Sequence, residues 1–216
     1  MCKEWSFLLF TNSVQKFIKE ENELYSLLFL LGSPGVGKTT HALLLAYKLA
    51  CYHIDASDLL KKFVKENLNS HDEQKKADAI AFQEAIANGR LTDRAKTWQL
   101  ITEEIQKLPN GTTVIISGYP RDKEYFAQID FVKYKVLGLI FLTASRKTIK
   151  KRLLKQKNRI DSNEEAVKAR LAVTALMRKA AAKFKALNLL IIVGANGALE
   201  ENRIRVLKAF RFLKRR

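Results

Sequence analysis

Short apolar runs alternate along the chain with longer segments in which apolar residues recur every three or four positions. The runs predict buried strands, because they lack the alternating polar residues of a half-exposed strand. The periodic segments predict helices. The predicted strands are 27–31, 114–117, 137–142 and 187–193. The predicted helices are 38–49, 57–66, 72–88, 93–107, 123–130, 146–157, 163–186 and 199–213. Ser57 and Gly89 are the expected N-cap and C-cap of the second and third helices.

This order of elements predicts an α/β fold in which helices cover both faces of a parallel sheet. The 216 residues suffice for one domain with a sizeable core, which we place at 27–216. Residues 1–26 carry apolar residues among Lys and Glu, and we expect a helical extension packed on the domain. A docking or membrane-surface segment is the alternative. Ligands of such folds bind at the carboxyl ends of the strands.

A glycine-rich segment follows the first predicted strand and opens the first helix. Its residues match the phosphate-loop pattern G-x-x-x-x-G-K-[ST] at every position: Gly32, Ser33, Pro34, Gly35, Val36, Gly37, Lys38 and Thr39. Backbone N–H groups of such a loop point at phosphate oxygens, and the helix N-terminus adds a favourable dipole. Lys38 would neutralise the β- and γ-phosphates of ATP. The Thr39 hydroxyl would face the accompanying Mg²⁺, and Thr40 would share that work.

The phosphate loop predicts the three-layer sandwich of P-loop NTPases but not the reaction. Guanine-selective GTPases need a base-recognising Asn-Lys-x-Asp segment, which the sequence lacks, so that class is excluded. Two cysteines, Cys2 and Cys51, have no metal or redox spacing, which favours a reducing compartment and a cytoplasmic location. No apolar run approaches the roughly 20 residues that a membrane span needs, so no transmembrane segment is expected.

Positive charge is concentrated in the last third of the chain. The formal net charge is +17, and residues 146–216 carry 21 Lys and Arg against 5 Asp and Glu. Such a field attracts phosphates of nucleotides, nucleic acid or anionic lipid. A solvated basic face is one interpretation, and a nucleic-acid-binding surface is the other.

Four segments, in order, resemble the adenylate kinase (nucleoside monophosphate kinase) family. The phosphate loop with Thr40 two places after its lysine is one, and Gly118-Tyr119-Pro120-Arg121 is another. Residues 53–61 resemble the start of the monophosphate-binding helix, and residues 159–165 with Arg170 resemble the segment after the lid. The resemblance runs from about 27 to 213. Only one short loop fits between Arg152 and Arg159, which is similar to short-lid members.

The resemblance implies a monomeric phosphotransferase that passes the γ-phosphate of ATP to a nucleoside monophosphate and yields two diphosphates. AMP is the expected acceptor. The resemblance also implies a monophosphate-binding arm at about 57–92 and a short lid at about 153–160.

The implied phosphate-clamping residues are Lys38, Arg121, Arg159 and Arg170, and Arg152 is expected to lie beside the donor nucleotide. The implied monophosphate-binding residues are Ala56, Lys61, Leu91, Gly118, Arg121 and Tyr125.

Several residues depart from the family pattern. Ser117 stands where the family usually has an aspartate that helps to hold Mg²⁺-bound water, and Lys61 replaces an arginine that grips the monophosphate. Tyr125 replaces a glutamine that recognises adenine, and a tyrosine can stack on any base. The other departures are Ala56, Gln156 and Ser162. Two interpretations stay open: a divergent active enzyme, and a catalytically weakened nucleotide-binding protein that acts on nucleic acid or a ribonucleoprotein. A small kinase of the shikimate or gluconate type is disfavoured by Gly-Tyr-Pro-Arg.

Overall fold

The computed structural model describes residues 25–154 and 164–216. Most of the predicted extension, residues 1–24, lies outside the described residues. Most of the predicted lid also lies outside them, and Gln156, Arg159 and Ser162 lie there too. Within the described part, no helix is both long and apolar enough to cross a lipid bilayer.

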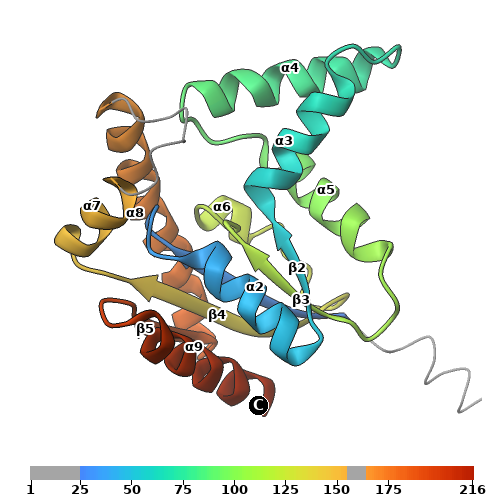
Figure 1. Cartoon of the computed structure of the whole chain (residues 1–216). Coiled ribbons are helices and arrows are strands. Elements are labelled where there is room, and N and C mark those ends of the chain that lie inside the picture. The colour runs from blue at the N-terminus through green and yellow to red at the C-terminus, as the bar shows by residue number, and fades with distance from the viewer. Residues whose placement is uncertain (1–24, 155–163) are drawn as a thin grey trace, which may run out of the picture.

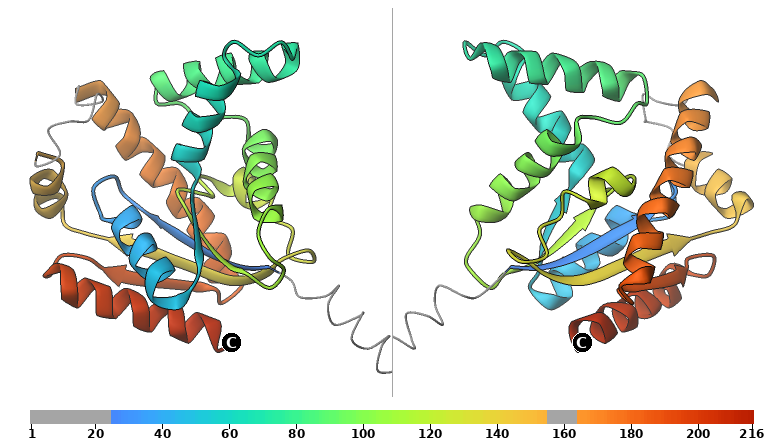
Figure 2. Two further views of the ribbon diagram at one scale, coloured as in Figure 1. Left: turned by 45° about the vertical axis from the view of Figure 1, so that its right-hand side comes forward. Right: turned by 180° about the vertical axis from the view of Figure 1, so that it is seen from behind.

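Five parallel strands form one sheet in the order β2-β3-β1-β4-β5 (Figure 1). The strands are β1 (Ser26–Gly32), β2 (Tyr52–Asp55), β3 (Thr113–Ser117), β4 (Lys135–Thr143) and β5 (Leu190–Gly194). Helices lie on both faces of this sheet (Figure 2), so the predicted α/β class with a parallel sheet is confirmed.

Side chains of β1 alternate between two hydrophobic clusters, one on each face of the sheet. Leu27, Phe29 and Leu31 join a cluster with α5 (Arg94–Gln106), α6 (Lys123–Phe126) and α8 (Glu164–Ala186). Leu28 and Leu30 join a second cluster with α2 (Lys38–Leu49) and α9 (Leu199–Lys214). All of these β1 side chains are fully buried, which explains why this strand is a continuous apolar run.

Two helices extend beyond the sheet as an arm: α3 (Ala56–Asn67) and α4 (Glu73–Ala87) (Figures 1 and 2). They hold together through a small cluster of Leu60, Val64 and Phe82, separate from the main core. The arm begins where β2 ends, and α7 (Arg146–Leu154) begins shortly after β4 ends. Both therefore start at the carboxyl edge of the sheet, where the phosphate loop also lies.

The sequence prediction missed β2 and misplaced some boundaries. β2 has only 4 residues at the edge of the sheet, and Tyr52 is exposed, so it gives no apolar run. Asp55, not Ser57, caps α3: its carboxylate accepts the N–H groups of Ser57 and Asp58. Asn88, not Gly89, is the C-cap of α4.

Two further boundaries differ from the prediction at turns. Helix α6 ends at Phe126, and the Asp130 carboxylate then accepts the N–H groups of Val132 and Lys133 to form a turn before β4. The strand predicted from 187 begins at Leu190, because Asn188 takes a left-handed conformation with φ 58°. The Asp130 side chain thus sets the turn before β4, and the left-handed backbone conformation of Asn188 sets the start of β5.

Candidate nucleotide-binding site

The phosphate loop connects β1 to α2 in a conformation that requires glycine. Gly32 has φ 144°, and a Cβ added there would lie 2.4 Å from the carbonyl oxygen of Leu142 on β4. Gly37 has φ 103° and is the N-cap of α2. Val36 is fully buried and anchors the loop in the core. The loop is therefore fixed against the sheet at Gly32 and Val36, while residues 33–35 are half-buried.

The α2 N-terminus and Lys38 give this loop a positive character. No side chain of the described residues caps α2, and the first turn of this helix has no acidic residue. Its first N–H groups and the helix dipole thus favour an anion. The Lys38 ammonium donates to the carbonyl oxygens of Gly32 at 2.8 Å and Ser33 at 3.2 Å. This places the lysine charge over the loop, as binding of β- and γ-phosphates requires.

Arg152 on α7 joins the phosphate loop to the end of β5. Its Nη1 donates to the Val36 carbonyl oxygen at 3.1 Å, and its Nη2 donates to the Ala195 carbonyl oxygen at 2.8 Å. The structure thus brings Arg152 to the loop, beside the expected donor nucleotide. Arg170 lies on α8, in a stretch whose side chains are not described, and its phosphate contact stays a prediction.

Arg121 occupies the loop after β3 and faces the start of α3. Its Nη2 donates to Ser57 Oγ at 2.9 Å, and its Nε donates to the Gly118 carbonyl oxygen at 3.2 Å. Burial lowers the pKa of Arg121, and the nearby Tyr125 and Asp55 oppose that shift. Both hydrogen-bond acceptors are neutral oxygens. A half-buried guanidinium of this kind gains from an anion that enters beside it.

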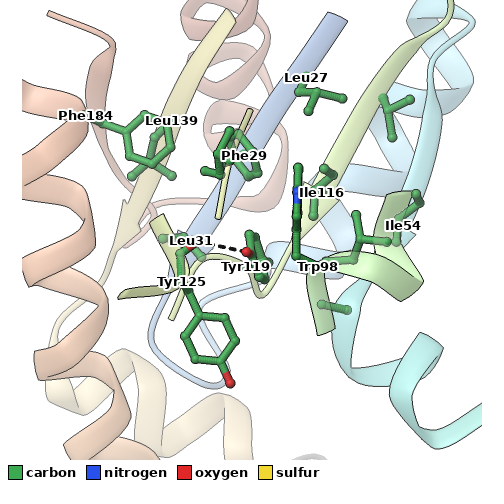
Figure 3. Close-up of a cluster of buried hydrophobic side chains, with 14 of the residues drawn as sticks. Leu27, Phe29, Leu31, Ile54, Trp98, Ile116, Tyr119, Tyr125, Leu139 and Phe184 are labelled. Atoms are coloured by element: carbon green, nitrogen blue, oxygen red, sulfur yellow. Dashed lines mark hydrogen bonds between the residues drawn. The ribbon is translucent and has the colours of Figure 1, made fainter. Parts of the chain in front are cut away.

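Aromatic packing fixes the loop that carries Arg121. The fully buried Tyr119 ring stacks on Trp98 of α5 with ring centroids 5.2 Å apart. Its hydroxyl donates to the Tyr125 carbonyl oxygen at 2.8 Å (Figure 3). Gly118 adopts φ 78°, and its N–H donates to the Leu30 carbonyl oxygen at 3.3 Å. Arg121 is therefore presented from a rigid platform, not from a free loop.

Tyr125 lies in the core instead of presenting a face to a base. Its ring is fully buried, and its hydroxyl bonds to the carbonyl and hydroxyl oxygens of Thr92. The guanidinium of Arg94 lies 5.8 Å from the ring centroid and pairs with Asp122 at 3.2 Å. A base cannot stack on this ring as it lies, so the expected stacking would require the ring to move.

The remaining residues predicted for the acceptor are dispersed. Ala56 is buried in the core, and Leu91 packs on the core half-buried. Lys61 lies one turn beyond Ser57 on α3, but its exposed ammonium is 3.7 Å from Asp58 Oδ1. It lines a hollow of about 390 Å³ between α3 and α4. Binding roles for these side chains stay predictions.

Asp55 is a site residue that the sequence analysis missed. It ends β2, where its Oδ2 accepts from Ser117 Oγ at 2.9 Å and from Thr39 Oγ1 at 3.3 Å. His53 Nε2 lies 3.0 Å from the same Ser117 oxygen, and burial lowers the pKa of this histidine while Asp55 and Asp58 oppose the shift. Asp55 thus links the phosphate loop to β3 and to the start of α3. A strand assignment for 52–55 would have pointed to it.

Sheet, phosphate loop and converging cations define a nucleotide-binding protein of the P-loop class. The family model described as adenylate kinase matches residues 30–184. The chain belongs to the adenylate kinase family.

Curated relatives agree with this assignment at modest identity. Human adenylate kinase isoenzyme 5 is 28% identical over 148 residues, which cover 67% of this chain and 25% of the relative. Chicken adenylate kinase isoenzyme 1 is 27% identical over 156 residues, 70% of this chain and 76% of the relative. Adenylate kinase 1 of Schistosoma mansoni is 28% identical over 178 residues, 80% of this chain and 86% of the relative. The chain thus spans a quarter of the isoenzyme 5 sequence and most of the other two.

Proposed function

We propose that this chain is a nucleoside monophosphate kinase that transfers the γ-phosphate of ATP to a nucleoside monophosphate, with AMP as the first acceptor to test. The observation that carries the proposal is the half-buried Arg121. It faces the start of the α3 arm, and its hydrogen-bond acceptors among the described residues are neutral oxygens. Lys38 supplies a second cation on the neighbouring strand-to-helix loop. One cation thus serves each side of a transferring phosphoryl group.

Phosphoryl transfer asks the protein chiefly for positioning and for positive charge around spreading negative charge. Lys38 and the α2 N-terminus would hold the donor phosphates. Arg121 would hold the acceptor phosphate through its planar fork, which suits phosphate oxygens. Arg152 would keep the phosphate loop in shape, because it bonds the Val36 carbonyl oxygen. Arg159 and Arg170 complete the proposed clamp.

Mg²⁺ is the proposed cofactor and would enter with ATP. When bound with ATP, it would supply neutralisation of phosphate charge. The residues present fit it: the Thr39 and Thr40 side chains are exposed at the start of α2, and an Asp55 carboxylate oxygen lies 3.3 Å from Thr39 Oγ1. We also propose that the chain is a monomer in the cytoplasm. Its monophosphate-binding arm would be residues 57–92, and its short lid would be residues 153–160.

A coupled ADP-release assay with ATP and Mg²⁺ tests this function. AMP, CMP, UMP, GMP and dTMP are offered in parallel to the full chain. Turnover that depends on one acceptor supports the kinase and names its base. Binding of ATP without turnover on any acceptor would contradict it.

A nucleic-acid-binding role is the second candidate, and the charge on α9 favours it. Arg203 and Arg205 pair with Glu200 and Glu201 near the start of this helix. The cations toward and just beyond the end of this helix are exposed: Lys208, Arg211, Lys214, Arg215 and Arg216. Phosphate binding by such cations weakens steeply with salt. Anisotropy of a labelled RNA would therefore rise on addition of the chain at low salt and fall as salt increases. No binding at low salt would exclude this role.

A further inference from the structure

Asp55 and Ser117 face each other across the β2–β3 pair. The parallel register aligns Asp55 with Ser117, at the carboxyl end of each strand. Ser117 Oγ donates to Asp55 Oδ2 at 2.9 Å. The single proton of the serine hydroxyl is then used, so His53 Nε2–H donates to Ser117 Oγ across 3.0 Å. The three side chains form a directed chain that ends on the carboxylate.

The two carboxylate oxygens of Asp55 have different hydrogen-bond partners. Oδ1 accepts from the backbone N–H groups of Ser57 at 2.9 Å and Asp58 at 3.4 Å, which caps α3. Oδ2 accepts instead from Ser117 and from Thr39 Oγ1 of the phosphate loop. A helix cap needs only one oxygen acceptor, so capping alone does not explain the hydrogen bonds of the second oxygen.

The position of Oδ2 matches a requirement of the donor site. P-loop proteins hold the metal of the bound nucleotide between the loop hydroxyl and a nearby carboxylate. The residue that ends β3, Ser117, brings no charge. Asp55 supplies a carboxylate from the neighbouring strand, with Oδ2 3.3 Å from the Thr39 hydroxyl.

We infer that Asp55 is the carboxylate that orients the Mg²⁺ of bound MgATP, directly or through its water, and that Ser117 positions it. In the family pattern an aspartate ends β3. In this chain the carboxylate belongs instead to Asp55, the residue directly opposite on β2. The inference rests on the proposed function, because it assumes MgATP as the donor. It means that Ser117 is not a mark of lost catalysis.

Metal binding by the full chain with ATP, measured from free Mn²⁺ by electron paramagnetic resonance, tests the inference without turnover. Asp55→Asn keeps an oxygen for the α3 cap but loses the charge. We expect it to weaken Mn²⁺ binding in the ATP complex about 10-fold or more, the range for loss of a group that orients a metal or its ligands. ATP affinity in EDTA should stay unchanged. Asp58→Asn is the matched control: it removes an exposed carboxylate from the helix that Asp55 caps and should leave Mn²⁺ binding as in the wild type.

The double exchange Asp55→Ser with Ser117→Asp separates charge placement from a general defect. It returns the carboxylate to β3 and should recover most of the Mn²⁺ affinity that Asp55→Asn loses. Thermal unfolding of each variant verifies that it is folded. Wild-type Mn²⁺ affinity in Asp55→Asn, or an equal loss of ATP affinity in EDTA, would overturn the inference. If the wild type transfers phosphate to no acceptor yet Asp55→Asn selectively loses Mn²⁺, the kinase proposal fails and this one stands.

Discussion

Arg152 holds the carbonyl oxygen of Val36: its Nη1 donates to that oxygen at 3.1 Å, from a residue on α7 to the centre of the phosphate loop. Its Nη2 bonds the Ala195 carbonyl oxygen at 2.8 Å, so one planar group ties the loop to the end of β5. A lysine ammonium is a compact point charge and lacks the planar fork that spans these two carbonyl oxygens.

Replacing Arg152 by lysine should therefore weaken ATP binding while it keeps the charge. We expect the Kd for ATP to rise about 10-fold, or about 1.4 kcal/mol, by isothermal titration calorimetry. Lys151→Ala, which removes an exposed cation from the same helix, serves as the control and should leave the Kd within about twofold. An unchanged Kd in Arg152→Lys would show that the positive charge, not the tie to Val36, matters.

Ser57→Ala should impair the acceptor side selectively. It removes the hydroxyl that accepts from Arg121 Nη2 at 2.9 Å, so the guanidinium is less well held. A hydrogen bond to a charged group contributes about 1.5–3 kcal/mol, so we expect the acceptor KM to rise about 10-fold or more. The KM for ATP should stay unchanged, and Ser57→Thr should retain most of the wild-type value. A rise in KM for ATP as large as that for the acceptor would contradict this division of labour.

Tyr125→Phe and Tyr134→Phe should change stability in different ways. The Tyr125 hydroxyl bonds Thr92, and its loss leaves buried Thr92 with fewer partners. We expect a loss of about 1–3 kcal/mol in free energy of unfolding, measured with urea. The Tyr134 hydroxyl is buried with no hydrogen-bond partner among the described residues, so its removal should be neutral or stabilising. Equal destabilisation by the two substitutions would refute this account.

Gly32→Ala should destabilise the fold through a single methyl group. The added Cβ would meet the Leu142 carbonyl oxygen at 2.4 Å, at a backbone φ of 144°. We expect a loss of more than about 2 kcal/mol in free energy of unfolding. Gly194→Ala is the control, because nothing lies within 4 Å of its added Cβ. It should stay within about 0.5 kcal/mol of the wild type. Similar unfolding free energies for both variants would argue against the β1–β4 contact.

The sequence predicts well those features whose cause is local. The phosphate loop is one, since a strand, a glycine turn and a helix follow one another within residues 26–49. The contact between Ser57 and Arg121 is different: it joins residues 64 positions apart through the β2–β3 register. Periodicity cannot supply a register, least of all for an edge strand of 4 residues.

The sequence pattern also does not predict which individual side chains are buried. The resemblance predicts a base-recognising role for Tyr125, yet three-dimensional packing places its ring near the Arg94 guanidinium and against Thr92. The sequence pattern does not predict the strand that Asp55 ends. It therefore cannot distinguish this carboxylate from one that is exposed to solvent. Both cases depend on which elements become neighbours in space, and the sheet order decides that.

Transfer of label from [γ-³²P]ATP to AMP is the most direct test of the proposed kinase. The wild-type chain with Mg²⁺ should produce labelled ADP that depends on AMP. Lys38→Met removes the charge over the phosphate loop while the chain stays folded. It should lower the rate by at least about 10²-fold, as loss of a charge-stabilising donor does. Wild-type-like transfer by Lys38→Met, or no labelled diphosphate from a wild-type chain that binds ATP, would contradict the account.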